Sequence, residues 1–267
     1  MAGTLARASR LAVRGLLYCW MPVALVAAWW YLPAPRSQYF PPLWVIIDAF
    51  RREWLGDGAH QISADLVPSL WHVLAGYALA VVGGVAIALL LSGVRPLYNA
   101  SLPLITFFRG LPSPALIPAL MLIFGLGGGF KVAIIAFGSM WPTLLNSYDG
   151  FLSMDEVQRD TARSYHLGPV RRIFTVQIPG AAPQIVAGAR ISLQVAILLM
   201  VASEFLASNE GIGFAISQAQ TNFDTPGMWS GMLLLGVVGI VLNALFVVAE
   251  RGILAWYLGM RVQQAGG

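Results

Sequence analysis

The chain has 267 residues, of which 58% are apolar and only 10% are charged, and its mean hydropathy is +0.72. An ordinary soluble domain has about 25% charged residues, so this composition excludes a water-soluble globular protein and predicts one integral membrane domain over residues 1–267. The net charge of +4 forms no basic patch for nucleic acid. A single cysteine excludes an intrachain disulfide, and neither that cysteine nor the three scattered histidines match a metal-ligand spacing.

Six charge-poor windows are long enough to cross the hydrocarbon core, which takes about 20 apolar residues. The predicted fold is therefore all-α, with about six transmembrane helices. The windows cover residues 15–35, 66–94, 110–130, 132–148, 183–207 and 225–249. The third window is interrupted by Pro112, Pro114 and Pro118, and it ends in a run of glycines at 125–129. Such backbone freedom is tolerated at membrane depth where protein or a water-filled cavity satisfies the released groups, so it predicts a helix near a pathway.

The distribution of arginine predicts the orientation of these spans. Residues 1–14 carry three arginines, and further arginines fall at Arg95, within 159–172, and at Arg251 and Arg261. All of these positions share one side if the number of spans is even, and the excess of positive charge assigns that side to the cytoplasm. We therefore expect both termini to be cytoplasmic, with 259–267 as the tail, 36–64 as an external loop and 65–258 as the core of the domain.

A basic, punctuated segment interrupts the apolar chain between the fourth and fifth spans. Four arginines lie within 159–172, the pair Gly168-Pro169 divides the segment, and Pro179 follows. Gly168-Pro169 is expected to end one helix and begin a second, which Pro179 and Pro183 are expected to terminate. The sequence thus predicts a cytoplasmic hairpin of two short helices over 155–179. A hairpin of this size cannot hold its own core.

The hairpin needs a partner, and two alternatives were weighed. Binding to anionic lipid would explain the arginines by themselves. It would explain neither the acidic residues Asp155, Glu156 and Asp160 nor the punctuation, so docking to another protein is the better interpretation.

The segment resembles the coupling-helix (EAA) motif of the membrane subunits of bacterial ABC importers. Asp160-Thr161-Ala162 stands in the place of Glu-Ala-Ala, and Val176-Gln177-Ile178-Pro179 matches the closing Ile-x-Leu-Pro. The usual motif glycine is replaced by His166, and Gly168 follows two residues later. The stretches 109–112, 124–127, 141–146, 203–207 and 211–213 look like the nitrate/sulfonate/taurine branch of that family, and the similarity covers roughly residues 60 to 260.

This resemblance implies a permease subunit in the bacterial inner membrane, paired with a second copy and surrounded by lipid. Its further partners would be two cytosolic ATP-binding subunits and an external substrate-binding protein. No Walker A sequence is present, so ATP and Mg²⁺ would be bound by the partner, and the chain is expected to be neither an enzyme nor a cofactor carrier. The implied ATPase-coupling residues are Asp160, Thr161, Ala162, Arg163, Tyr165, His166, Leu167 and Gly168. The implied substrate is a small anion such as a sulfonate, taurine or nitrate, with a pyrimidine-type vitamin precursor as the alternative.

Charged and amide side chains within the spans are the candidates for the translocation pathway. A charge at the bilayer centre costs about 2.5–3.5 kcal/mol on insertion scales, which makes such residues functional candidates. The candidates are Arg109, Asn146, Gln194, Ser203 and Glu204. Glu204 could line an external gate or lie at an interface, whereas Arg190 is interpreted as a structural anchor near the hairpin. The glycines of 211–213 predict a turn before an external helix.

Two other classes of protein remain as rivals. A self-sufficient secondary carrier or channel would need ion-coupling acids in the spans or an inverted repeat, and Glu204 is the only deep acid. A membrane scaffold without a transport role would leave the broken third span without a purpose.

Overall fold

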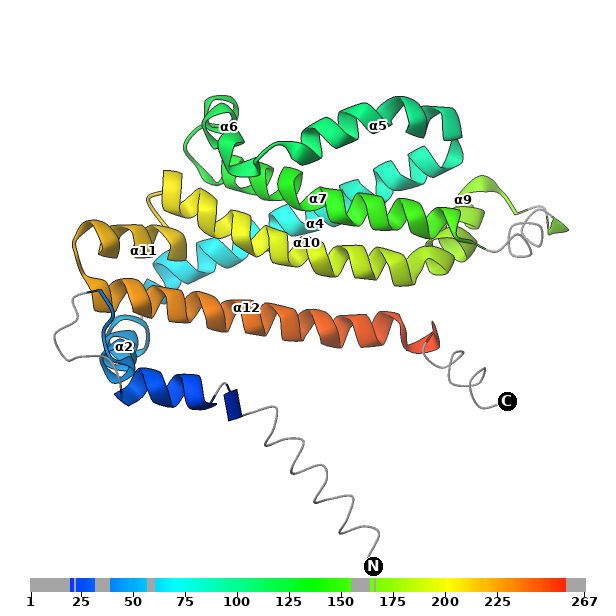
Figure 1. The fold of residues 1–267 in the computed structure, drawn as a ribbon. Coiled ribbons are helices and arrows are strands. Elements are labelled where there is room, and N and C mark those ends of the chain that lie inside the picture. The colour runs from blue at the N-terminus through cyan, green and yellow to red at the C-terminus, as the bar shows by residue number, and fades with distance from the viewer. Residues whose placement is uncertain are drawn as a thin grey trace, which may run out of the picture.

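The computed structural model describes residues 20–21, 23–31, 39–56, 61–154, 164–165 and 167–257. Every regular element in these ranges is helical, which confirms the predicted all-α class (Figure 1). Four helical segments are long and apolar enough to cross a membrane: Ile62–Gly93, Gly128–Leu152, Pro169–Ala207 and Thr225–Ile253. A bent pair, Pro96–Gly110 with Ser113–Phe124, adds a fifth if it is counted as one span. The predicted first span at 15–35 lies partly outside the described residues. Within it the structure describes 20–21 and 23–31, and these residues are helical.

Three long helices form the centre of the bundle: α4 (Val67–Gly93), α7 (Gly128–Leu152) and α10 (Ile178–Ala207). Helix α7 packs against both α4 and α10, and α12 (Thr225–Ile253) runs beside α10 on the other side (Figure 1). Lipid gives no hydrophobic force between helices, so close backbone approach at small residues has to hold them together. A Cβ on Gly76 would lie 2.6 Å from the Ile135 side chain, and one on Gly188 would lie 2.9 Å from the carbonyl oxygen of Pro142. The sequence therefore permits this packing through its glycines.

Buried hydrogen bonds add to the contacts between the same helices. The hydroxyls of Thr143 on α7 and Ser192 on α10 lie 2.7 Å apart, and the Tyr77 hydroxyl on α4 donates to the carbonyl of Ala189 at 3.1 Å. These bonds join the three central helices at their shared interface.

The third predicted span differs from the window 110–130. The chain forms α5 (Arg95–Gly110), a 3₁₀ turn η3 (Ser113–Leu116) and the short α6 (Ile117–Phe124), with a 90° bend between α5 and the rest. Leu111 and Pro112 are extended, and Gly125 ends α6 with φ +76°. The search for charge-free windows overlooked α5 because Arg95 and Arg109 lie at its two ends. The window 110–130 then joined into one span residues that the prolines separate.

The second half of the predicted hairpin runs without interruption into the fifth span. Helix α9 (Pro169–Arg172) is followed by a π-helical turn η4 (Ile173–Gln177) and then by α10, giving one helical segment of 39 residues. The start at Pro169 was predicted, but the expectation that Pro179 and Pro183 end the helix is wrong. A local π adjustment satisfies backbone groups that a proline leaves free, and η4 ends at Gln177, two residues before Pro179.

The opposite end of the bundle is closed by short elements: α2 (Leu43–Phe50), the π-helical turns η1 (Arg51–Leu55) and η2 (Ile62–Leu66), and α11 (Ile212–Thr221). Trp54 of η1 is buried, and its indole N–H donates to the hydroxyl of Ser230 on α12 at 3.3 Å. Nearby, the rings of Trp29, Phe40 and Trp229 pack with centroids 5.1–5.3 Å apart. This aromatic cluster has the composition of a membrane-interface belt.

Candidate functional site

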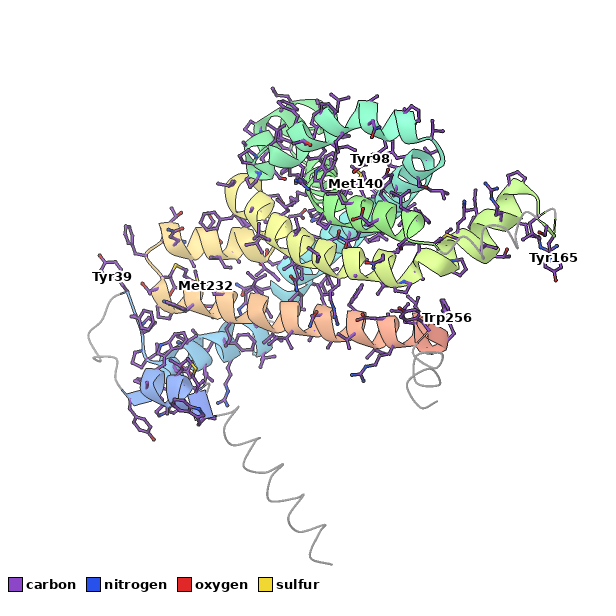
Figure 2. The ribbon with its side chains drawn as sticks, turned by 45° about the vertical axis from the view of Figure 1, so that its right-hand side comes forward. Tyr39, Tyr98, Met140, Tyr165, Met232 and Trp256 are labelled. Atoms are coloured by element: carbon purple, nitrogen blue, oxygen red, sulfur yellow. The ribbon has the colours of Figure 1, made fainter. Side chains whose placement is uncertain are left out.

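The described part of the segment predicted to couple to an ATPase lies at one tip of the bundle, called here the α9 end. Residues 155–163 and His166 lie outside the described residues, which leaves Asp160, Thr161, Ala162 and Arg163 without a structural account. Tyr165 projects from this tip, away from the bundle (Figure 2). Leu167 and Gly168 follow it, and Gly168 precedes the first residue of α9.

The described part of the α9 end exposes apolar and basic side chains together. Tyr165 is 76% exposed, Val170 67% and Phe174 66%, and the neighbouring Arg171 and Arg172 are exposed as well. The predicted face of Val170, Ile173 and Phe174 therefore finds no core within the described chain. Large exposed apolar groups beside charged ones mark a surface that a partner covers.

Among the pathway candidates, Gln194 lies on an open groove along α10. The groove has a volume of about 640 Å³. Its lining comes from α10, with Pro114 of η3 and Leu235 of α12 added, and Gln194 is the only polar residue of the set: Pro114, Gln194, Ile197, Leu198, Val201, Ala202, Phe205, Leu206 and Leu235. The groove thus adjoins the broken third span through Pro114, and the predicted pathway stays a prediction.

The other neutral candidates make local bonds. The Asn146 amide donates to the carbonyl of Pro142 at 2.8 Å, and the Ser203 hydroxyl donates to that of Met200 at 2.8 Å. Arg109 occupies the last turn of α5 and is exposed. The structure does not bring these three side chains together with Gln194 at one point, and their role in the pathway stays a prediction.

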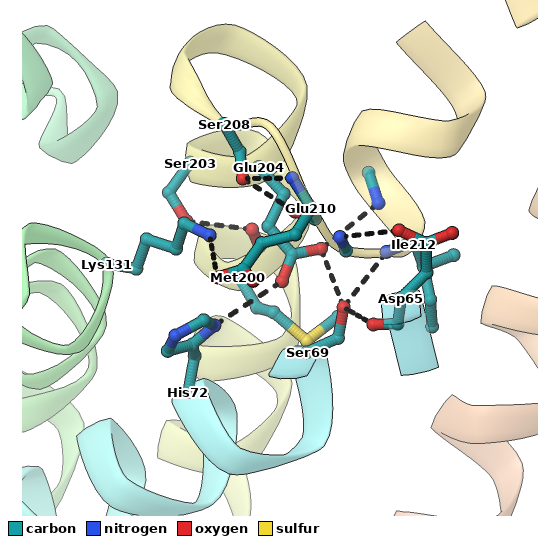
Figure 3. A network of polar contacts seen from close by, with 12 residues as sticks. Asp65, Ser69, His72, Lys131, Met200, Ser203, Glu204, Ser208, Glu210 and Ile212 are labelled. Carbon is teal, nitrogen blue, oxygen red and sulfur yellow. Dashed lines mark hydrogen bonds and ion pairs between the residues drawn. The ribbon is translucent and has the colours of Figure 1, made fainter. Parts of the chain in front are cut away.

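Glu204 lies at the other end of the molecule, called here the α11 end, and it is fully buried. Figure 3 shows its carboxylate inside a polar network that joins α4, α10 and the start of α11. Three successive backbone N–H groups donate into this network: Gly211 to Asp65 Oδ1 at 2.9 Å, Ile212 to Ser69 Oγ at 2.9 Å, and Gly213 to Glu204 Oε2 at 3.1 Å. The first N–H groups of a helix have no partner inside it, so these three side chains cap α11.

Two further contacts tie the cap to its surroundings. Ser69 Oγ lies 2.8 Å from Glu204 Oε2 and 2.9 Å from the carbonyl oxygen of Asp65, so its single hydrogen has two acceptors within reach. The Nδ1 atom of buried His72 lies 3.9 Å from Glu204 Oε1. We call Asp65, Ser69, His72 and Glu204 the α11 cap.

Glycine is required where the chain wraps around the carboxylate. Gly211 has φ +108°, and a Cβ there would lie 2.5 Å from Glu204 Oε2. A Cβ on Gly213 would lie 2.7 Å from the carbonyl oxygen of Val201. The predicted turn before a helix is confirmed at these glycines, since Gly211 is the N-cap of α11.

Two ion pairs join charged residues of the helical bundle: Lys131 with Glu210, and Arg190 with Glu250. The Lys131 side chain on α7 is only 2% exposed, and its Nζ lies 3.2 Å from Glu210 Oε1. Arg190 on α10 pairs with Glu250 on α12 at 2.8 Å, so this arginine links two spans.

Sequence reasoning missed Asp65, Ser69 and His72 as parts of one network. A signal was available: these residues stand at i, i+4 and i+7, which places three polar side chains on one face of an otherwise apolar helix. No group of three or more potential metal-ligating residues occurs in the described part of the chain.

These features define a class: a multi-pass helical membrane protein with a broken span, one exposed tip and one tightly capped end. The chain belongs to the family described as the binding-protein-dependent transport system inner membrane component, which matches residues 67–254. It is thus a permease subunit of an ABC importer and an integral protein of the inner membrane.

Individual relatives agree with this assignment. A putative aliphatic sulfonates transport permease protein, SsuC of Escherichia coli, is 26% identical over 263 residues, 92% of this chain and 93% of that protein. The formylaminopyrimidine transport permease protein ThiX of Halalkalibacterium halodurans is 29% identical over 183 residues, 68% and 72% of the two chains. An inward-facing structure of the MetNI methionine ABC transporter has the same fold, with a TM-score of 0.61 at 18% identity over 79% of this chain and 97% of the matched one.

Proposed function

We propose that this permease forms the translocation pathway of an ATP-driven importer and binds a cytosolic ATPase subunit through residues 155–179. The complete importer holds two copies of the permease, two ATPase subunits and an external substrate-binding protein. ATP and Mg²⁺ are bound by the ATPase, and this chain contributes the route and the mechanical coupling. The α9 end accordingly faces the cytoplasm, and the α11 end faces outward.

The exposed surface of the α9 end carries this proposal. Tyr165, Val170 and Phe174 remain uncovered, although the helix that bears the last two is continuous with a membrane span. A partner seated there pushes directly on α10, because no loop separates α9 from it. ATP can then shift the permease between two states if the ATPase dimer binds one of them better.

The groove beside the broken span supports the pathway. Its apolar wall and the single amide of Gln194 offer no strong binding site for a charged solute, which suits a route that a substrate must also leave. Arg109, in the last turn of α5 before the 90° bend, is the cationic candidate near the same break. A second copy covering the groove would turn this open face into an enclosed passage.

The proposed substrate is a small anion of the sulfonate, taurine or nitrate class. The sulfonate relative matches nearly the whole chain, which favours this class. A pyrimidine-type vitamin precursor is the second candidate, supported by the formylaminopyrimidine relative. Uptake of labelled taurine, nitrate and formylaminopyrimidine in the native host, each with the other two as competitors, distinguishes the two classes. Uptake of taurine or nitrate through this permease supports the anion class, and uptake of formylaminopyrimidine supports the vitamin precursor.

The coupling surface is tested by purification from the native host in mild detergent, followed by measurement of the ATPase subunits retained. Phe174→Ala should weaken ATPase binding by about tenfold or more, as removal of an aromatic anchor does. Leu245→Ala, a similarly exposed apolar change in the C-terminal third of α12, is the matched control and should retain the subunit. A permease that emerges alone and transports in liposomes without ATP would overturn the proposal.

A further inference from the structure

Phe223, in the turn between α11 and α12, combines two unfavourable properties. Its ring is 91% exposed, and among the described residues it is the one non-glycine residue with positive φ, at +56°. The Phe223 N–H donates to the carbonyl of Gln220 at 3.1 Å, and the Asp224 N–H donates to that of Ala219 at 2.9 Å. This pair of bonds is the Schellman motif, in which the left-handed position is ordinarily glycine.

Within the part of the chain that the structure describes, the largely exposed ring gains no contact that explains a phenylalanine at this position. Glycine would adopt the same backbone without strain, and a polar residue would suit the exposed site. Strained, exposed positions of this kind concentrate where a protein meets a ligand or partner. The backbone of the turn is also fixed, because Asp224 caps α12 by accepting from the Gly227 N–H at 3.1 Å.

The location of Phe223 favours a protein partner over lipid. The aromatic cluster of Trp29, Phe40 and Trp229 has the character of an interface belt, and Trp229 lies one turn inside α12. A membrane interface at this cluster would put Phe223, which precedes the first residue of α12, on the aqueous side of it. The residues beside it, Asn222 and Asp224, are polar.

A polar pocket beside the turn that bears Phe223 defines the chemistry of that partner, although Phe223 itself does not line it. The pocket has a volume of about 160 Å³, and Asn222 and Asp224 both line it. Its remaining polar lining consists of two more carboxylates and two more amides: Glu53, Asp65, Gln61 and Gln218. None of the described residues that line this pocket is basic, so a cationic group from outside would meet three carboxyl groups.

We infer that Phe223 and the adjoining acidic pocket form the docking site for the external substrate-binding protein. That protein presents an apolar pocket for the Phe223 ring and, beside it, a lysine or arginine that enters the acidic pocket. The inference rests on the proposed function, which places the α11 end on the outer side of the membrane.

The first test replaces Phe223 by a photo-crosslinking phenylalanine analogue in intact cells of the native host and identifies the adduct by mass spectrometry. The expected adduct is a soluble substrate-binding protein, joined through an apolar segment beside a basic residue. The same analogue at Leu245, an exposed residue nearer the C-terminal end of α12, is the control and should not give it. An adduct at Phe223 with lipid alone or with a second permease, or none at all, overturns the inference.

The second test uses the binding protein identified in this way, with the intact permease–ATPase complex in nanodiscs. Phe223→Gly and Phe223→Asn both keep a backbone that tolerates positive φ. Each should raise the concentration of binding protein needed for half-maximal ATPase stimulation by about tenfold or more. Basal ATPase activity and the thermal midpoint should not fall, and Phe223→Tyr should retain most of the stimulation.

The two proposals fail in different ways. Unchanged stimulation in Phe223→Gly overturns the docking site while the importer assignment stands. A wild-type permease that retains no ATPase at all overturns the proposed function, and the docking inference falls with it.

Discussion

Gly211→Ala should be the most damaging single-methyl change at the α11 end. The residue has φ +108° and ψ +162°, a region that only glycine occupies without strain. The added Cβ would lie 2.4 Å from Glu204 Cδ, and 2.5 and 2.7 Å from the two carboxylate oxygens. The carboxylate cannot yield without releasing the Gly213 N–H at 3.1 Å and Ser69 Oγ at 2.8 Å.

The expected loss of unfolding free energy is about 3–5 kcal/mol, from backbone strain together with broken hydrogen bonds to a buried charged group. The assay is reversible unfolding in mixed detergent micelles, followed by far-UV circular dichroism. Gly236→Ala, in the middle of α12, is the matched control, because a Cβ there meets nothing within 4 Å. It should be neutral or raise stability by up to about 1 kcal/mol. A Gly211→Ala protein as stable as the control would refute the description of the α11 cap.

Three further predictions concern the same end, each measured by the same unfolding assay. Ser69→Ala removes the acceptor of the Ile212 N–H and should cost about 1–3 kcal/mol; no loss would contradict the capping role. Glu210→Gln should destabilise more than Lys131→Met, by about 1 kcal/mol, because only the former leaves a buried ammonium unpaired; the reverse order would show that the pair is not formed. Burial, reinforced by Asp224 and opposed by the hydrogen bond from Ser230, raises the pKa of Glu53 above its usual 4.5. The folded state then binds the Glu53 proton more tightly than the unfolded state, so this carboxyl adds stability that is complete below pH 4.5 and is lost as the pH rises through the raised pKa. Glu53→Gln should flatten the dependence of stability on pH in that window, and an unchanged slope would contradict the assignment.

The spans that carry no charge and no break were predicted well from the sequence. The window 66–94 corresponds to α4 at Val67–Gly93, and 225–249 lies inside α12 at Thr225–Ile253. Both were found because partition into lipid depends on composition, which a window measures directly.

Where backbone geometry decides the outcome, the windows gave wrong bounds. Helix α5 went unnoticed between Arg95 and Arg109, and Pro179 and Pro183 were taken for helix ends. Whether a proline ends a helix depends on how its neighbours satisfy the freed carbonyl, and here a π turn does so. That adjustment leaves no mark on hydropathy.

The candidate site was predictable in part. Glu204 was identified as an unusual acid, and the turn at Gly211 and Gly213 was predicted, but the two were not connected. Glu204 accepts directly from the Gly213 N–H, nine residues away, but the network extends to Ser69, which is 135 residues away from Glu204 in the chain. A single sequence carries no direct information about such a long-range pair, and only the polar stripe on α4 hinted that one face of this span meets other polar groups.

The continuous helical segment from Pro169 to Ala207 has its irregular turn and its interior prolines near one end. At 1.5 Å per residue its 39 residues span about 58 Å. The π turn and both interior prolines fall in the first part, so compliance is concentrated close to the tip, and no proline follows Pro183 along the remaining shaft. The far end of that shaft is fastened by Glu204 to α4 and α11. A displacement of the α9 end would therefore reach the α11 end as a tilt of the whole segment, and α11 with the turn after it would move with that segment.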